Sequence, residues 1–222
     1  MLKKIIQMDK PVVDNKEIID FIDLGFEDAL RLKELSEKNP KLKLMGIERP
    51  SLKGSVSVKV DNIDLRWGGV LKELTEIQGE SVKTVNSDFM FSEFYVIGWK
   101  ELFPAAKLNE VSMGDLGRRV HGGFFIELFM SLREEVLKQV RRILLPHGRF
   151  YISEYRANIE SLSECLKDAG FDFAEKELEI AEMDKTKFLK LLRDKRKEGM
   201  DSQLFPIMRI EAHKKKNWVN FI

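Results

Sequence analysis

The sequence predicts an α/β fold, a doubly wound and mostly parallel sheet of about seven strands with helices on both faces. Short apolar runs typical of buried strands alternate with longer segments in which apolar residues recur every three or four positions. Helical crossovers connect strands that run in the same direction, so this alternation favours a parallel sheet. The 222 residues suffice for one sizeable core. We therefore expect a single domain over residues 1–222.

The amino-terminal half begins with a strand, a helix and a second strand. Residues 18–25 read Ile-Ile-Asp-Phe-Ile-Asp-Leu-Gly, an almost continuous apolar run closed by glycine, which predicts a buried strand. Residues 27–38 have alanine and leucine at helical spacing, and Asn39 with Pro40 ends this helix because proline disfavours helix in the residue before it. Residues 42–48 predict the second buried strand. The unit spans about 30 residues and should be parallel and right-handed.

The middle of the chain allows two readings of the third strand. Residues 55–61 alternate between polar and apolar, which predicts a strand with one face in water. This segment is either an edge strand of the core or part of a hairpin insertion at 50–65. Residues 67–78 predict a helix and residues 82–87 a strand. We favour 82–87 as the third strand, because the helix at 67–78 then precedes it.

The carboxy-terminal half continues the alternation of strands and helices. A helix at 124–145 has a continuous apolar stripe at spacings of three and four, which predicts packing against the sheet. The other expected elements are strands at 107–113, 149–155, 172–179 and 205–212, and helices at 159–169 and 185–197.

Several short motifs cluster between residues 132 and 173. The long helix ends in Arg-Arg-Ile-Leu at 141–144, Leu-Pro-His-Gly at 145–148 leads into a hydrophobic run, and the next helix ends in Asp-Ala-Gly-Phe at 168–171. This segment resembles the carboxy-terminal half of class I S-adenosylmethionine-dependent methyltransferases. The resemblance implies a Rossmann-like fold with an antiparallel last strand and S-adenosylmethionine as cofactor.

The resemblance also implies cofactor contacts at the turn after the first strand, where the family has an acidic residue and a glycine-rich sequence. Residues 23–29 read Asp-Leu-Gly-Phe-Glu-Asp-Ala. Asp23, Gly25 and Phe26 are the candidate contacts in this turn. Glu27 and Ala29 stand where further glycines are usual. Glycine would supply room and freedom for positive φ, and Glu27 adds a negative charge, so the turn departs from the family pattern.

Two later strand ends complete the candidate cofactor site. Glu48 ends the strand at 42–48, where the family uses an acid to accept hydrogen bonds from the ribose hydroxyls. Asp88 with Phe89 follows the strand at 82–87, where an acid meets the adenine amino group and an apolar neighbour packs on the ring. If 55–61 is the third strand instead, Asp61 takes the adenine role and Asp88 moves toward the chemistry. As an ordinary alternative, an acid at a strand end forms a turn or a helix cap.

The chemistry itself is not assigned by the sequence. Methyl transfer depends mainly on positioning, so few catalytic side chains are obligatory. We expect residues 89–123 to shape the acceptor side, and the catalytic residues and the acceptor, small or macromolecular, stay unknown. The resemblance implies that the loop after the strand at 107–113 faces the methyl group, where the sequence offers Ser112, Asp115, Arg118, Arg119 and His121.

Composition excludes several classes of function. Lys and Arg number 38 against 37 Asp and Glu, so no global field attracts nucleic acid or membranes. RNA binding through local basic clusters is open but not indicated. The single cysteine, Cys165, lies on an apolar helix face and should be buried, and three separated histidines predict no metal site. No apolar run approaches the roughly 20 residues that span a bilayer, and the start does not resemble a secretory signal. We therefore expect a cytoplasmic protein.

Two functions follow from these features. The first is an S-adenosylmethionine-dependent methyltransferase of unknown acceptor, favoured by Glu48 and by Asp88 with Phe89. The alternative is a non-catalytic methyltransferase-like binding or assembly protein that has lost cofactor binding, favoured by Glu27 and Ala29.

Overall fold

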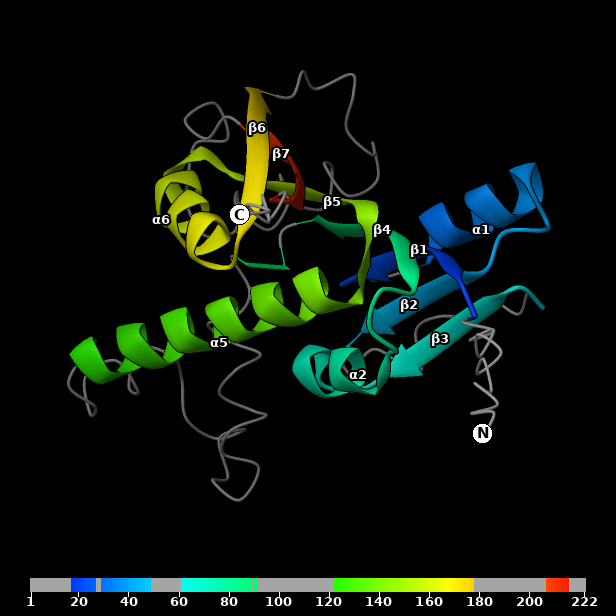
Figure 1. The fold of residues 1–222 in the computed structure, drawn as a ribbon, viewed down its shortest axis with the longest axis horizontal. Helices are drawn as coiled ribbons and strands as arrows, with labels where there is room; N and C mark the ends of the chain where they lie inside the picture. Colours follow the sequence, from blue (N-terminus) through cyan, green and yellow to red (C-terminus); the bar gives the residue numbers. More distant parts are fainter. Residues whose placement is uncertain are drawn as a thin grey trace, which may run out of the picture.

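A single seven-stranded sheet organises the computed structural model, which describes residues 17–26, 29–48, 61–88, 90–91, 122–177 and 207–215 (Figure 1). The strand order is β3-β2-β1-β4-β5-β7-β6. The strands are β1 (Ile19–Leu24), β2 (Leu44–Glu48), β3 (Ile63–Trp67), β4 (Val82–Asp88), β5 (Leu144–Tyr155), β6 (Phe171–Glu177) and β7 (Ile207–Lys214). The helices are α1 (Leu30–Lys38), α2 (Val70–Glu76), α5 (Gly122–Ile143) and α6 (Arg156–Asp168).

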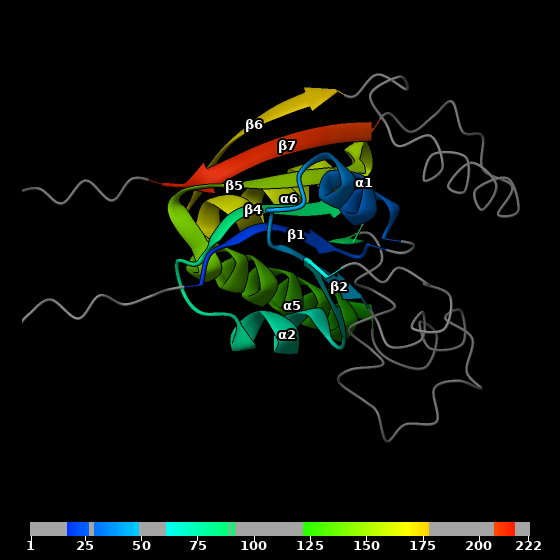
Figure 2. The ribbon, with the colours of Figure 1, turned by 90° about the vertical axis from the view of Figure 1, so that its right-hand side faces the viewer.

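The pairing of the strands confirms the predicted sheet. β3, β2, β1, β4 and β5 run parallel, and β7 lies antiparallel between β5 and β6 (Figure 2). Figure 1 shows α1 and α6 on opposite sides of the central strands. The fold is therefore doubly wound and mostly parallel, with an antiparallel last strand.

The third strand corrects two of the sequence predictions. The segment that we favoured as third, 82–87, is β4, which pairs with β1 on the side away from β2. The third strand is β3, which pairs with β2 and includes Trp67, a residue predicted to begin a helix. Ile63, Leu65 and Trp67 alternate onto one face, and Gly68 and Gly69 separate them from α2. Strand periodicity thus continues through the point where we placed the helix.

Other sequence predictions lie close to the observed elements or outside the described residues. The predicted helices at 124–145 and 159–169 correspond to α5 and α6, and the predicted strands around them correspond to β5, β6 and β7. Residues 49–60, the predicted strand at 107–113 and the predicted helix at 185–197 lie outside the described part of the chain. None of the described helices is both long enough and apolar enough to cross a membrane.

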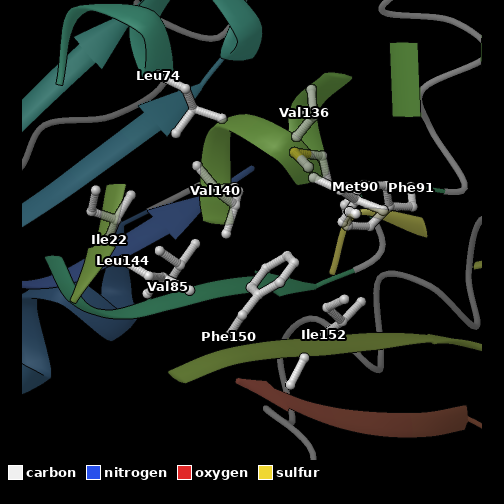
Figure 3. Packing of buried hydrophobic residues seen from close by; sticks show 14 of the residues in the cluster. Ile22, Leu74, Val85, Met90, Phe91, Val136, Val140, Leu144, Phe150 and Ile152 are labelled. Atoms are coloured by element: carbon white, nitrogen blue, oxygen red, sulfur yellow. The ribbon is translucent and has the colours of Figure 1, made fainter. Parts of the chain in front are cut away.

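Two hydrophobic clusters cover the two faces of the sheet. The main cluster joins the sheet to α2, α5 and α6, with α5 packed between the other two helices. Figure 3 shows Leu74 of α2 and Val140 of α5 facing Ile22, Val85 and Phe150 of the sheet. Cys165 belongs to this cluster, and burial raises the pKa of its thiol. The α1-side cluster on the opposite face consists of Phe26, Ala29, Leu32 and Leu44.

Candidate functional site

Three acidic side chains lie at the carboxyl ends of neighbouring parallel strands. Glu48 is the last residue of β2, Asp88 is the last residue of β4, and Asp23 is next to last in β1. Asp23 is level with Gly46 of β2 and with Asn86 of β4. Side chains alternate along a strand, so Asp23, Glu48 and Asp88 share the face on which α1 packs. The structure therefore brings the three predicted acids to one edge of the sheet.

The carboxylates of all three acids are shielded from water, and two of them share a cation from α1. Asp23 is 1% exposed and accepts a hydrogen bond of 2.8 Å from Asn86 Nδ2. Arg31 places one guanidinium nitrogen 3.6 Å from Asp23 Oδ1 and another 2.5 Å from Asp88 Oδ2. Buried carboxylates are costly unless they are paired, so these contacts stabilise the ionised acids.

Arg31 is the residue that sequence reasoning missed. It lies four positions before Leu35, which packs against the α1-side cluster, and residues at that spacing share one side of a helix. The apolar spacing in this helix therefore contained the signal that Arg31 faces the sheet.

The turn after β1 retains left-handed backbone at two positions. Gly25 has φ of +70° and its N–H donates to the Ile47 carbonyl at 2.9 Å. A Cβ on Gly25 would lie 3.7 Å from Met90 Cβ, an ordinary contact, so glycine is needed there for conformation and not for space. Ala29 has φ of 58°. Ala29, which stands where a glycine is expected, thus adopts the left-handed conformation that glycine favours, whereas Glu27 lies outside the described residues.

Phe26, a predicted cofactor contact, places its ring in the core. The ring packs edge-on against Trp67 with centroids 5.2 Å apart. It also covers Gly46, where an added Cβ would lie 2.6 Å from the ring. Phe26 can therefore border a ligand only through its backbone. Phe89, its counterpart after β4, lies outside the described residues.

A hollow of about 760 Å³ lies at the opposite edge of the sheet. It is lined by residues at the amino ends of β1, β2 and β3, including Ile19, Leu44 and Ile63. Of the residues considered for the cofactor site, Asp61 lines it, whereas Asp23, Gly25, Phe26, Glu48 and Asp88 do not. Open α/β sheets bind ligands beyond the carboxyl ends of their strands. We therefore place the candidate site at the edge with Asp23, Glu48 and Asp88.

Solved structures with a similar fold include one complex with S-adenosylmethionine and one enzyme described as dependent on it. Phosphoethanolamine N-methyltransferase 2 of Haemonchus contortus, solved with S-adenosylmethionine, matches with a TM-score of 0.50 and 14% identity over 90% of this chain and 50% of that one. A TehB-like S-adenosylmethionine-dependent methyltransferase of Corynebacterium glutamicum matches with a TM-score of 0.50 and 12% identity over 90% and 82%.

This chain has the class I S-adenosylmethionine-dependent methyltransferase fold. The cyclase SpnF shares it, with a TM-score of 0.53 and 11% identity over 90% of this chain and 76% of that one. The chain spans about half the length of the Haemonchus enzyme. No family model and no curated protein matches the sequence. At these identities the class I methyltransferase fold is established, and activity must be argued from the site.

Proposed function

We propose that this chain binds S-adenosylmethionine at the carboxyl ends of β1, β2 and β4 and transfers its methyl group to an acceptor. The main support is the group of three buried carboxylates, Asp23, Glu48 and Asp88, beside the left-handed turn at Gly25. Ionised carboxylates only accept hydrogen bonds, which fits a ligand that presents hydroxyl and ammonium groups. Glu48 would hold the ribose hydroxyls, as acids do in dinucleotide-binding folds.

The position of Asp88 favours a place near the methyl group that is transferred, and not beside the adenine ring. β4 lies beside β1, and Asp88 shares Arg31 with Asp23. Asp61 lies in the turn before β3, at the amino end of that strand, so it does not take the adenine role that we considered. When bound, S-adenosylmethionine supplies a methyl group activated by its sulfonium sulfur. Asp23 and Asp88 would orient the cofactor, and the catalytic residues and the acceptor stay unassigned.

Titration calorimetry with S-adenosylmethionine and S-adenosylhomocysteine tests this proposal, with NADH as a negative control. Wild type should bind at least one of these two methyl-cycle ligands. Glu48→Gln should weaken this binding by about tenfold or more, because hydrogen bonds to a charged acceptor contribute roughly 1.5–3 kcal/mol. Asp20→Asn is the matched control, since Asp20 lies on β1 near its amino end. Equal losses in the two variants would contradict the role of Glu48.

The alternative is a non-catalytic binding or assembly protein, and one observation favours it. Arg31 already pairs with both Asp23 and Asp88, so an entering cationic ligand must compete with an internal cation. Absence of heat with either methyl-cycle ligand at millimolar concentration, for a protein shown to be folded by circular dichroism, would support this alternative.

A further inference from the structure

The guanidinium of Arg31 bridges the carboxyl ends of β1 and β4, where it pairs with two carboxylates that are shielded from water. Its side chain is 24% exposed, whereas those of Asp23 and Asp88 are 1% and 5% exposed. Interactions between charges are screened less when the charges are buried. The positive charge of Arg31 therefore acts on any ligand that enters the space beside these carboxylates.

The contacts around Arg31 fix its position. Leu32, the next residue of α1, is fully buried in the α1-side cluster, and Asn86 holds Asp23 by a hydrogen bond of 2.8 Å. An arginine paired with two carboxylates has few alternative rotamers that keep both contacts. Its charge is thus a fixed part of the site and not a mobile surface charge.

The same two strands provide an internal comparison at their other ends. Lys83 of β4 pairs with Asp20 of β1 at 2.6 Å, and the Lys83 side chain is 58% exposed. This pair has the same charges as Arg31 with Asp23, but it lies near the amino ends of the strands in contact with water. Lys83 should therefore leave ligand binding at the carboxyl ends unchanged.

We infer that Arg31 is a specificity-determining residue, which lowers the affinity of the site for a cationic ligand more than for its neutral analogue. The inference rests on the proposed function, because its ligands are S-adenosylmethionine and S-adenosylhomocysteine. The first has a sulfonium charge that the second lacks. A fixed positive charge repels this extra charge wherever the ligand lies beside it, so the sign of the effect does not depend on the binding pose. Specificity is the difference between the two affinities.

Calorimetric titration of both ligands into wild type, Arg31→Gln and Lys83→Gln tests this inference. Removal of the Arg31 charge should shift the ratio of the two dissociation constants about tenfold toward S-adenosylmethionine, a size expected for unit charges several ångströms apart in a partly buried site. Lys83→Gln removes an equal charge and should keep the wild-type ratio. Arg31→Lys restores the charge and should move the ratio back toward that of wild type.

The outcomes separate this inference from the proposed function. If wild type and Arg31→Gln both bind and have the same ratio of dissociation constants, the role of Arg31 is overturned, but the proposed cofactor site is supported. Binding only by Arg31→Gln would support the inference in its strongest form and show that the native site is closed. Binding by neither protein would overturn both proposals. If Arg31→Gln does not fold, the double variant Arg31→Gln/Asp88→Asn is compared with Asp88→Asn. These two proteins differ only in the Arg31 charge, and the double variant leaves no Asp88 carboxylate without its cation, so the ratio of dissociation constants should shift in the same direction.

Discussion

Gly46 illustrates how a single missing side chain shapes the packing of β2 near its carboxyl end. It lies on β2 beneath the Phe26 ring, and an added Cβ would also approach Leu32 Cδ1 to 2.8 Å. Because Gly46 has no side chain, the Phe26 ring packs directly on β2, within the α1-side cluster and away from the candidate site. Ala29 combines two features, since its methyl group belongs to the α1-side cluster and its backbone is left-handed. Neither constraint is visible in the order of residue types alone.

We expect Gly46→Ala to lower the free energy of unfolding by about 1–3 kcal/mol, because a methyl group forced into a packed core displaces its neighbours. Urea denaturation measures the loss. Gly79→Ala is the control, since an added Cβ there would approach no heavy atom closer than 3.6 Å. Phe26→Leu should reduce the additional cost of Gly46→Ala in the double variant. Strict additivity of the two losses would show that the Phe26 ring does not impose the constraint.

At the scale of elements, β1, β2 and β4 are held together near their amino ends by a charged cluster around Asp20. Burial raises the pKa of Asp20, but the hydrogen bonds from Lys83 and from the Lys43 backbone, with the charges of both lysines, outweigh it and bring the pKa below its ordinary value. A carboxyl group with a lowered pKa in the folded state stabilises the fold above its unfolded pKa, and this contribution disappears as the pH falls through the lowered value.

The difference in unfolding free energy between wild type and Asp20→Asn should therefore be largest above about pH 5 and shrink in more acidic solution. Urea denaturation at a series of pH values measures this difference. Lys83→Gln removes one source of the lowered pKa, so the contribution of Asp20 should vary less with pH in that background. A difference that grows on acidification would show that the sign of the Asp20 effect is wrong.

At the scale of the whole molecule, the pattern of strands and helices was sufficient to predict the fold class, and the resemblance to class I methyltransferases added the antiparallel last strand and the three acids at strand ends. Buried strands and amphipathic helices have characteristic spacings of apolar residues in the sequence. Acids at the carboxyl ends of neighbouring parallel strands lie at the same edge of the sheet. The sequence was not sufficient to place the third strand, because β3 has only five residues and is separated from α2 by only Gly68 and Gly69. The sequence did not indicate the role of Arg31, because one of its two partners, Asp88, lies on β4, far along the chain.

The whole fold also separates two candidate locations for a ligand. The acidic edge has Asp23, Glu48 and Asp88, whereas the hollow at the amino ends of β1, β2 and β3 has lysines, acids and apolar residues in a mixed surface. Strand direction favours the acidic edge, since ligands of such sheets bind beyond the carboxyl ends of the strands. We therefore expect the ligand to bind at the acidic edge and not in the hollow.

A crystal structure of the protein grown with S-adenosylhomocysteine tests that claim most directly. We expect the ligand at the carboxyl ends of β1, β2 and β4, with its ribose hydroxyls hydrogen-bonded to Glu48 and its remaining polar groups beside Asp23 and Asp88. A ligand bound instead in the hollow at the amino ends, or a fully occupied ligand that leaves Glu48 without contact, would contradict the proposed site.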